Sequence, residues 1–241
     1  MVRGPAAVLT AYAGALLYFE IAPSLPALRD GDITTIASGA LGMAALALGV
    51  FTLVPARQET GLLVVLLAGG GLLAGALQVA DAGPAAEVAK LLFAGVLGML
   101  LARALDTPAV IIAVPLFVAG IELAGVLGAP GAPLVHRHAE MVNFVTFPLP
   151  RWGGGGASQL AMSDLVFLGF YVSAAWRYGF RRRATAVGLS IALLGTLVAG
   201  VALGQELPVL PALALGLLAP NLDRLKPLLS GRGGEMDPRR A

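Results

Sequence analysis

The chain contains no cysteine and only two histidines among its 241 residues. Without cysteine it can form neither disulfide bonds nor thiolate metal sites. His136 and His138 are too few for a typical histidine-rich metal centre. We therefore expect no bound metal and no other cofactor.

Charged residues are scarce as well, at 12% of the chain, whereas 58% of the residues are hydrophobic. Soluble domains carry about 25% charged residues. Such a chain has too little polar surface to cover a globule, so we expect an integral membrane protein whose first partner is the lipid bilayer. The net charge of +2 is small and does not indicate a nucleic-acid partner.

Eight apolar segments are long enough to cross a bilayer, which takes about 20 residues each. They lie near residues 5–22, 33–54, 61–80, 84–104, 108–128, 158–179, 184–204 and 206–222. Proline, glycine and charged residues separate them. The expected fold is an all-α, polytopic transmembrane helical bundle of about eight spans.

One connection, 129–157, is much longer than the others and contains the run "MVNFVTF", which could form an extended segment. It separates an N-terminal five-span half, 1–128, from a C-terminal three-span half, 158–222. The polar, glycine-rich tail, 223–241, is expected to be disordered in the cytoplasm.

The basic residues indicate the orientation. With a cytoplasmic N-terminus, twelve of the 16 Lys and Arg residues fall on the cytoplasmic side, including the run Arg181–Arg183. The positive-inside rule then places both termini in the cytoplasm. The bias towards Ala, Gly and Arg is typical of a GC-rich prokaryotic genome, so we expect a multi-pass protein of a prokaryotic cell membrane.

Several aromatic residues lie near the ends of the expected spans. Trp152, Tyr171, Trp176 and Tyr178 are of this kind. Trp and Tyr are enriched at membrane–water interfaces, so we interpret these four as interfacial anchors.

Four acids fall within or near the apolar segments, where a carboxylate costs roughly 2.5–3.5 kcal/mol at mid-membrane. Glu20 lies near the end of its segment and can reach the interface. Glu87 precedes Lys90 by three residues, a spacing that allows an ion pair within one helix. Glu122 and Asp164 have no basic residue within a turn.

Glu122 and Asp164 stand about six residues from the outer ends of consecutive antiparallel segments, so both should lie roughly 9 Å below the same face. Two carboxyl groups that meet at one depth cannot both ionise easily, and such a pair shares a proton as in an aspartic protease. Two alternatives remain open: a proton or cation site in a small transporter or channel-like protein, and polar contacts in a non-catalytic scaffold.

Three stretches resemble the presenilin and signal peptide peptidase family of intramembrane aspartyl proteases. Leu207-Pro-Val-Leu-Pro211 resembles its Pro-Ala-Leu signature, and "DLVFLGFY" from Asp164 resembles the run after its Gly-x-Gly-Asp aspartate. In "GIELAGVLGAPGAPL", Ile121-Glu122 stands where the family has Tyr-Asp. The resemblance covers roughly residues 110–220.

The resemblance implies a presenilin-like core in which Asp164 and Glu122 form a catalytic dyad around a water molecule. Pro208, Val209 and Leu210 would shape the substrate groove, and Ser163 would also contact the substrate. The substrates implied are transmembrane segments of membrane proteins. A glutamate in place of an aspartate, and "AMSD" in place of Gly-x-Gly-Asp, mark a divergent member, active or inactive.

Overall fold

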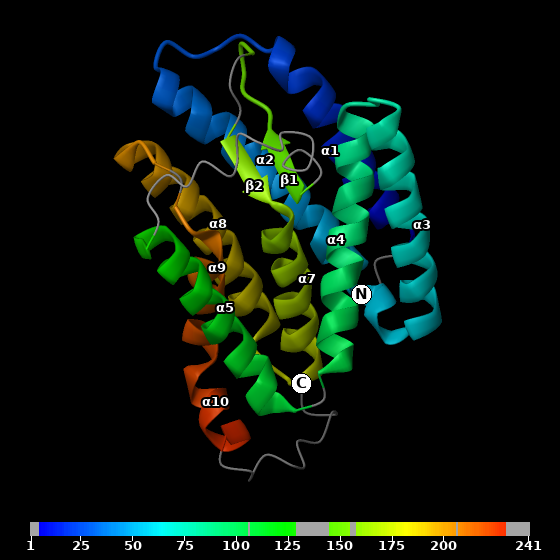
Figure 1. The fold of residues 1–241 in the computed structure, drawn as a ribbon, viewed down its shortest axis with the longest axis vertical. Helices are drawn as coiled ribbons and strands as arrows, with labels where there is room; N and C mark the ends of the chain where they lie inside the picture. The colour runs from blue at the N-terminus through cyan, green and yellow to red at the C-terminus, as the bar shows by residue number, and fades with distance from the viewer. Residues whose placement is uncertain (1–4, 106, 129–144, 155–157, 206, 230–241) are drawn as a thin grey trace.

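The computed structural model describes residues 5–105, 107–128, 145–154, 158–205 and 207–229. Over these ranges it contains eight α-helices of ten residues or more, arranged as a bundle (Figure 1). They are α1 (Pro5–Ile21), α2 (Gly31–Leu53), α3 (Thr60–Val79), α4 (Pro84–Ala104), α5 (Pro108–Gly128), α7 (Met162–Arg177), α8 (Arg182–Leu203) and α9 (Val209–Leu218).

Each apolar segment predicted from the sequence corresponds to one of these helices, with ends that differ by a few residues. Five helices are long and apolar enough to cross a membrane unaided: α1, α2, α3, α4 and α8. Short 3-10 turns, η1 (Ala22–Ser24) and η2 (Val54–Gln58), extend α1 and α2. The chain therefore has the architecture of a multi-pass membrane protein.

Helix α9 continues through η4 (Ala219–Asn221) into a short helix, α10 (Leu222–Leu229). The expectation of a disordered tail is thus wrong for residues 223–229. Leu222 and Leu225 are three residues apart, a helical spacing, with charged residues between them, and Leu225 is buried. Residues 230–241 lie outside the described ranges.

Two short strands interrupt the helical architecture. β1 (Thr146–Leu149) pairs antiparallel with β2 (Ser158–Ala161), with Thr146 opposite Ala161 and Leu149 opposite Ser158. The sixth predicted span therefore begins too early, since residues 158–161 pair with β1 instead of starting the helix. The end of "MVNFVTF" does form a strand, while residues 141–144, like His136 and His138, lie outside the described ranges.

Helix ends follow local sequence signals. Asp30 caps α2, its Oδ1 accepting hydrogen bonds from the N–H groups of Asp32 (2.8 Å) and Ile33 (3.1 Å). Gly204 ends α8 in the left-handed conformation, with φ 63°. Pro208 directly precedes the first residue of α9 and holds extended backbone there.

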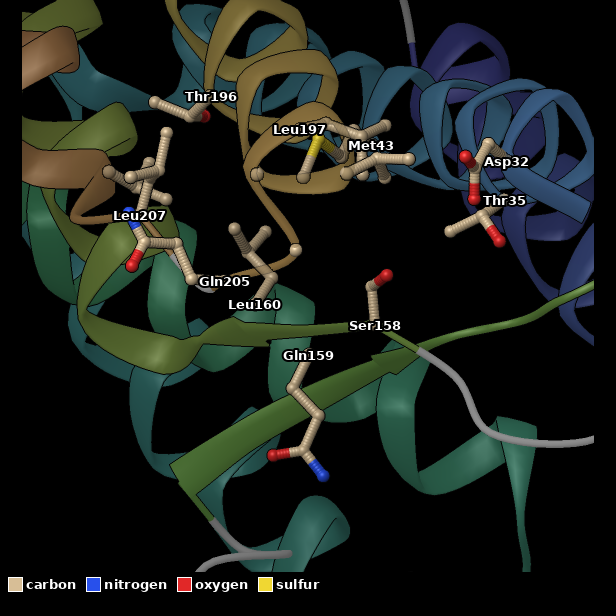
Figure 2. Close-up of a pocket in the computed structure, with 14 residues that line it drawn as sticks. Asp32, Thr35, Met43, Ser158, Gln159, Leu160, Thr196, Leu197, Gln205 and Leu207 are labelled. Carbon is tan, nitrogen blue, oxygen red and sulfur yellow. The ribbon is translucent and has the colours of Figure 1, made fainter. Parts of the chain in front are cut away.

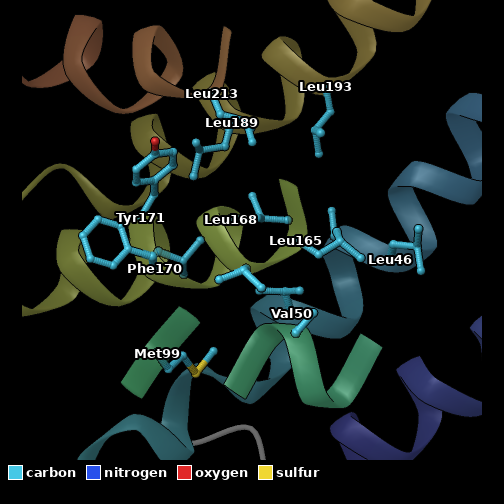
Figure 3. Packing of buried hydrophobic residues seen from close by; sticks show 14 of the residues in the cluster. Leu46, Val50, Met99, Leu165, Leu168, Phe170, Tyr171, Leu189, Leu193 and Leu213 are labelled. Carbon is cyan, nitrogen blue, oxygen red and sulfur yellow. The ribbon is translucent and has the colours of Figure 1, made fainter. Parts of the chain in front are cut away.

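Helix α7 is the centre of the bundle. Every residue from Leu168 to Ala175 is buried, which is the pattern of a helix enclosed on all sides. Figure 3 shows its side chains meeting those of the surrounding helices. The residues in contact there include Leu46 and Val50 of α2, Met99 of α4, Leu189 and Leu193 of α8, and Leu213 of α9.

Two helix pairs cross at glycine contacts. A Cβ atom on Gly98 of α4 would collide with the backbone carbonyl of Val166 in α7, and one on Gly169 would collide with the backbone of Gly95. In the same way, Gly188 of α8 and Gly216 of α9 leave no room for a Cβ on each other's side. The α4–α7 and α8–α9 pairs therefore pack backbone to backbone.

The two sequence halves interleave. Helix α4 of the first half packs chiefly on α7 of the second, and α5 packs on α9 and α10. Large apolar side chains cover much of the outer surface, for example Leu72 (77% exposed) and Val79 (91% exposed) of α3. Such a surface is suited to lipid.

Candidate functional site

Asp164 lies in the first turn of α7, directly after β2. Its Oδ2 accepts a hydrogen bond from the backbone N–H of Ala161 (3.1 Å), the residue that precedes the helix. The side chain is only 3% exposed, and Oδ1 has no hydrogen-bond partner among the described residues. The expected depth of six residues into the helix is wrong, because β2 occupies the residues that were assigned to its first turn.

Glu122 lies six residues before the end of α5, as the sequence analysis placed it. Its Oε2 accepts a hydrogen bond from the backbone N–H of Leu210 (2.9 Å), and the N–H of Val209 interacts with the same carboxyl group. These N–H groups belong to the first turn of α9, where the helix dipole favours negative charge. The first acid and the Pro208-Val209-Leu210 motif are thus joined directly.

The Glu122 and Asp164 carboxyl groups interact electrostatically with each other. Each is held by a backbone N–H and neither forms an ion pair with a basic residue among the described parts of the chain. The structure therefore brings together the two acids that the sequence singled out, at the level of the first turns of α7 and α9.

Tyr171 belongs to the same cluster, although the sequence analysis assigned it to the membrane interface. It is fully buried, and its hydroxyl interacts electrostatically with both Asp164 and Glu122. The hydroxyl has no hydrogen-bond partner among the described residues. The available signal was its spacing: Tyr171 follows Asp164 by seven residues, which places both on one face of a helix.

The residues of the Pro208 motif differ in their exposure. Pro208 and Val209 are half-buried, and Leu210 is 5% exposed. Ser163 is exposed and lies beside Asp164 in the first turn of α7. Ser163 is thus adjacent to Asp164, and Pro208 and Val209 directly precede Leu210, which binds Glu122.

A cavity of about 360 Å³ begins beside this cluster (Figure 2). Its walls come from β2, the last turns of α8, the connection into α9 and one face of α2. The lining residues include Ser158, Leu160, Leu197, Gln205, Leu207 and Val209. Neither acid lines the cavity itself. Two lining residues are next to the residues that bind the acids: Val209 precedes Leu210, which binds Glu122, and Leu160 precedes Ala161, which binds Asp164.

Strand β2 has a strand partner on one side only. The described sheet contains β1 and β2 alone, so the second edge of β2 is not paired with another described strand. The side chains of Leu160 and Ser158 point towards the cavity in Figure 2, and that of Gln159, which also lines it, points in the opposite direction. Because side chains stand perpendicular to a sheet, the cavity meets the side-chain face of β2, and the second edge of the strand lies in the plane of the sheet.

A buried base connects to Asp164 through the hairpin. Lys90 is fully buried; its Nζ forms an ion pair with Glu87 Oε1 (2.8 Å) and donates a hydrogen bond to the backbone carbonyl of Thr146 (2.8 Å). Thr146 is the register partner of Ala161, whose N–H binds Asp164. The Glu87–Lys90 pair predicted from the sequence is confirmed, and it also fixes the hairpin that leads into α7.

Among the described residues, no group of three or more His, Asp or Glu side chains could hold a metal ion. Comparisons of the chain with known protein families, curated proteins and solved structures found no match.

Proposed function

We propose that this chain is a divergent intramembrane aspartyl protease, which cleaves transmembrane segments of membrane proteins with Glu122 and Asp164 as its dyad. The observation that carries the proposal is the hydrogen bond from Leu210 to Glu122, beside Asp164. Three separate stretches of sequence, each resembling a motif of one protease family, meet at that point.

The chemistry requires two carboxyl groups in different protonation states. The ionised carboxyl takes a proton from water as the water oxygen attacks the peptide carbonyl carbon, while the other carboxylic acid donates its proton to the carbonyl oxygen. Collapse of the tetrahedral intermediate breaks the C–N bond and protonates the leaving amine. Charge repulsion between Glu122 and Asp164 favours the singly protonated pair that this requires.

A helical substrate must be unwound before its peptide bond is accessible, because helical peptide groups are hydrogen-bonded internally. The edge of β2 that no described strand pairs supports binding of the unwound segment as an added strand, and the cavity beside Val209 offers room for substrate side chains. Ser163, Pro208 and Leu210 would then lie along the scissile region.

The test is cleavage of a model transmembrane peptide by purified protein in detergent, with products located by mass spectrometry. Wild type is expected to cleave, and Asp164→Ala is expected to lose all detectable cleavage. The matched control is Glu20→Gln, which removes an exposed acid of α1 and should cleave as wild type does. Equal cleavage by wild type and Asp164→Ala would refute the dyad.

Glu122→Asp separates an active enzyme from an inactive relative. Shortening the side chain by one methylene moves the carboxyl group by about 1.5 Å, a displacement that can change rate 100-fold. If the natural glutamate is competent, Glu122→Asp slows cleavage. If wild type is inactive and Glu122→Asp cleaves, the chain is a silenced member of the same architecture.

A further inference from the structure

One end of the bundle gathers arginine side chains from four elements. Arg57 lies in η2, Arg103 and Arg177 stand in the last turns of α4 and α7, and Arg182 begins α8; α4 and α7 both end at the lower end of Figure 1. Arg103 donates a hydrogen bond to the backbone carbonyl of Arg57 (2.8 Å). Arg177 donates to the backbone carbonyl of Arg103 (2.9 Å). These two bonds hold the Arg103 and Arg177 side chains at the helix ends, and Arg57 Nη1 donates to the backbone carbonyl of Val54 (2.9 Å).

Two of these arginines stack on the same indole ring. The guanidinium carbon of Arg182 lies 3.8 Å from the ring centroid of Trp176, and that of Arg57 lies 4.4 Å from it. The two guanidinium groups repel each other. Within the described parts of the chain, no Asp or Glu forms an ion pair with either of them.

This arrangement has the chemistry of an anion site. The indole ring holds both guanidinium groups close to it, and no carboxylate among the described residues pairs with either charge. A phosphate group bound beside the ring would accept hydrogen bonds from these guanidinium groups and offset their mutual repulsion.

We propose that Arg57, Trp176 and Arg182 form a binding site for the headgroup of an anionic phospholipid. The site lies at the ends of helices that are long and apolar enough to cross a membrane, which is where headgroup phosphates are found. In the turns of α8 that follow, Val187 and Ile191 are 57% and 65% exposed and offer an apolar surface for acyl chains. Trp176 lies in the last turn of α7 and Asp164 in the first, so the site is at the opposite end of that helix and does not depend on the proposed proteolysis.

Trp176 itself reports binding. The chain has two tryptophans, so Trp152→Phe leaves Trp176 as the only one. Titration of phosphatidylglycerol into this variant in neutral detergent should change the tryptophan emission in a saturable way, and phosphatidylcholine should not. In the same background, Arg57→Gln with Arg182→Gln should weaken the apparent affinity at least about tenfold, because each contact to an anionic headgroup contributes about 1 kcal/mol.

The matched control is Arg181→Gln. Arg181 neighbours Arg182 but pairs with Asp223 (2.9 Å) and is not stacked on Trp176, so the titration should shift by less than twofold. A parallel titration with inorganic phosphate tests whether the site binds a free anion instead. An equal response to phosphate at the same concentration would overturn the lipid assignment in favour of a free-anion site.

Native mass spectrometry of the unmodified protein supplies a measurement that needs no variant. With equal amounts of phosphatidylglycerol and phosphatidylcholine, the protein should retain the anionic lipid preferentially, and Arg57→Gln with Arg182→Gln should lose that preference. Equal retention of both lipids by the unmodified protein would overturn the proposal.

Discussion

Two pairs of ionisable side chains lie inside this bundle and are compensated in different ways. Glu87 is paired with a base, Lys90, whose Nζ also binds a backbone carbonyl. Glu122 is paired with another acid, Asp164, and each of these carboxyls is held by a backbone N–H. The first pair neutralises itself, and the second keeps an excess of negative charge.

The difference separates a structural role from a chemical one. An ammonium group beside a buried carboxylate stabilises its ionised form, so the contact acts as an ion pair. Two carboxyls that repel each other keep one proton between them, and that proton can be transferred. Glutamate therefore has a structural role at Glu87 and a proposed chemical role at Glu122. Removing the partner of Glu87 should lower stability, and removing the partner carboxyl of Glu122 should not.

The largest change in stability is expected from Lys90→Met. The substitution leaves Glu87 inside the bundle without its base, which costs about 3–5 kcal/mol for a broken buried pair. It also removes the hydrogen bond to Thr146 that fixes β1. Thermal unfolding in detergent should show a melting temperature well below that of wild type. An unchanged melting temperature would mean that the Glu87–Lys90 pair is not what holds this region together.

The second prediction concerns the double variant Glu87→Leu with Lys90→Met. Replacing both members of a buried ion pair with apolar residues is often neutral or stabilising, so this variant should recover most of the loss, on the order of 2 kcal/mol or more. The unfolding measurement is the same. If the double variant is as unstable as Lys90→Met alone, the loss comes from the Thr146 contact and not from the unpaired carboxylate.

Asp164→Asn should change stability in the opposite direction. It removes one of two repelling carboxyl groups that must otherwise share a proton, and asparagine can still accept the hydrogen bond from Ala161. The free energy of unfolding should stay the same or rise by about 1 kcal/mol, as is common when strained functional sites are neutralised. Loss of cleavage with this gain identifies a functional acid; a marked drop in melting temperature would identify a structural one.

The smallest effect is expected from Tyr171→Phe. The hydroxyl has no hydrogen-bond partner among the described residues, so its removal should change the free energy of unfolding by less than about 1 kcal/mol. If the hydroxyl contacts the reacting groups, the cleavage rate should fall roughly tenfold with no matching loss of stability. Unfolding and cleavage assays on one preparation separate the two outcomes.

Hydropathy was sufficient to locate the helices, because an apolar stretch such as residues 84–104 admits one low-energy solution in a membrane. The Glu87–Lys90 pair was predictable for a similar reason, since both residues lie on one helix. The start of the sixth predicted segment was not predictable, because the strand Ser158–Ala161 forms only by pairing with the separate strand Thr146–Leu149. Tyr171 was missed because hydropathy does not distinguish an enclosed helix from one at the lipid boundary.

The acids were identified from sequence by their lack of a basic neighbour, and their proximity followed from matched depth. The inference succeeded for Glu122 through α5 but misplaced Asp164 along α7. The contact of Glu122 with the first turn of α9 could not be predicted, because no local sequence pattern links α9 to α5.

The glycine crossings have a mechanical consequence. Because Gly98 and Gly169 bring the backbones of α4 and α7 into contact, we expect these two helices to move together as a first rod, and Gly188 and Gly216 to couple α8 and α9 in the same way as a second. Asp164 travels with the first rod, and Glu122 is tied to the second through Leu210. A small slide of one rod past the other would separate or join the carboxyls without bending any helix.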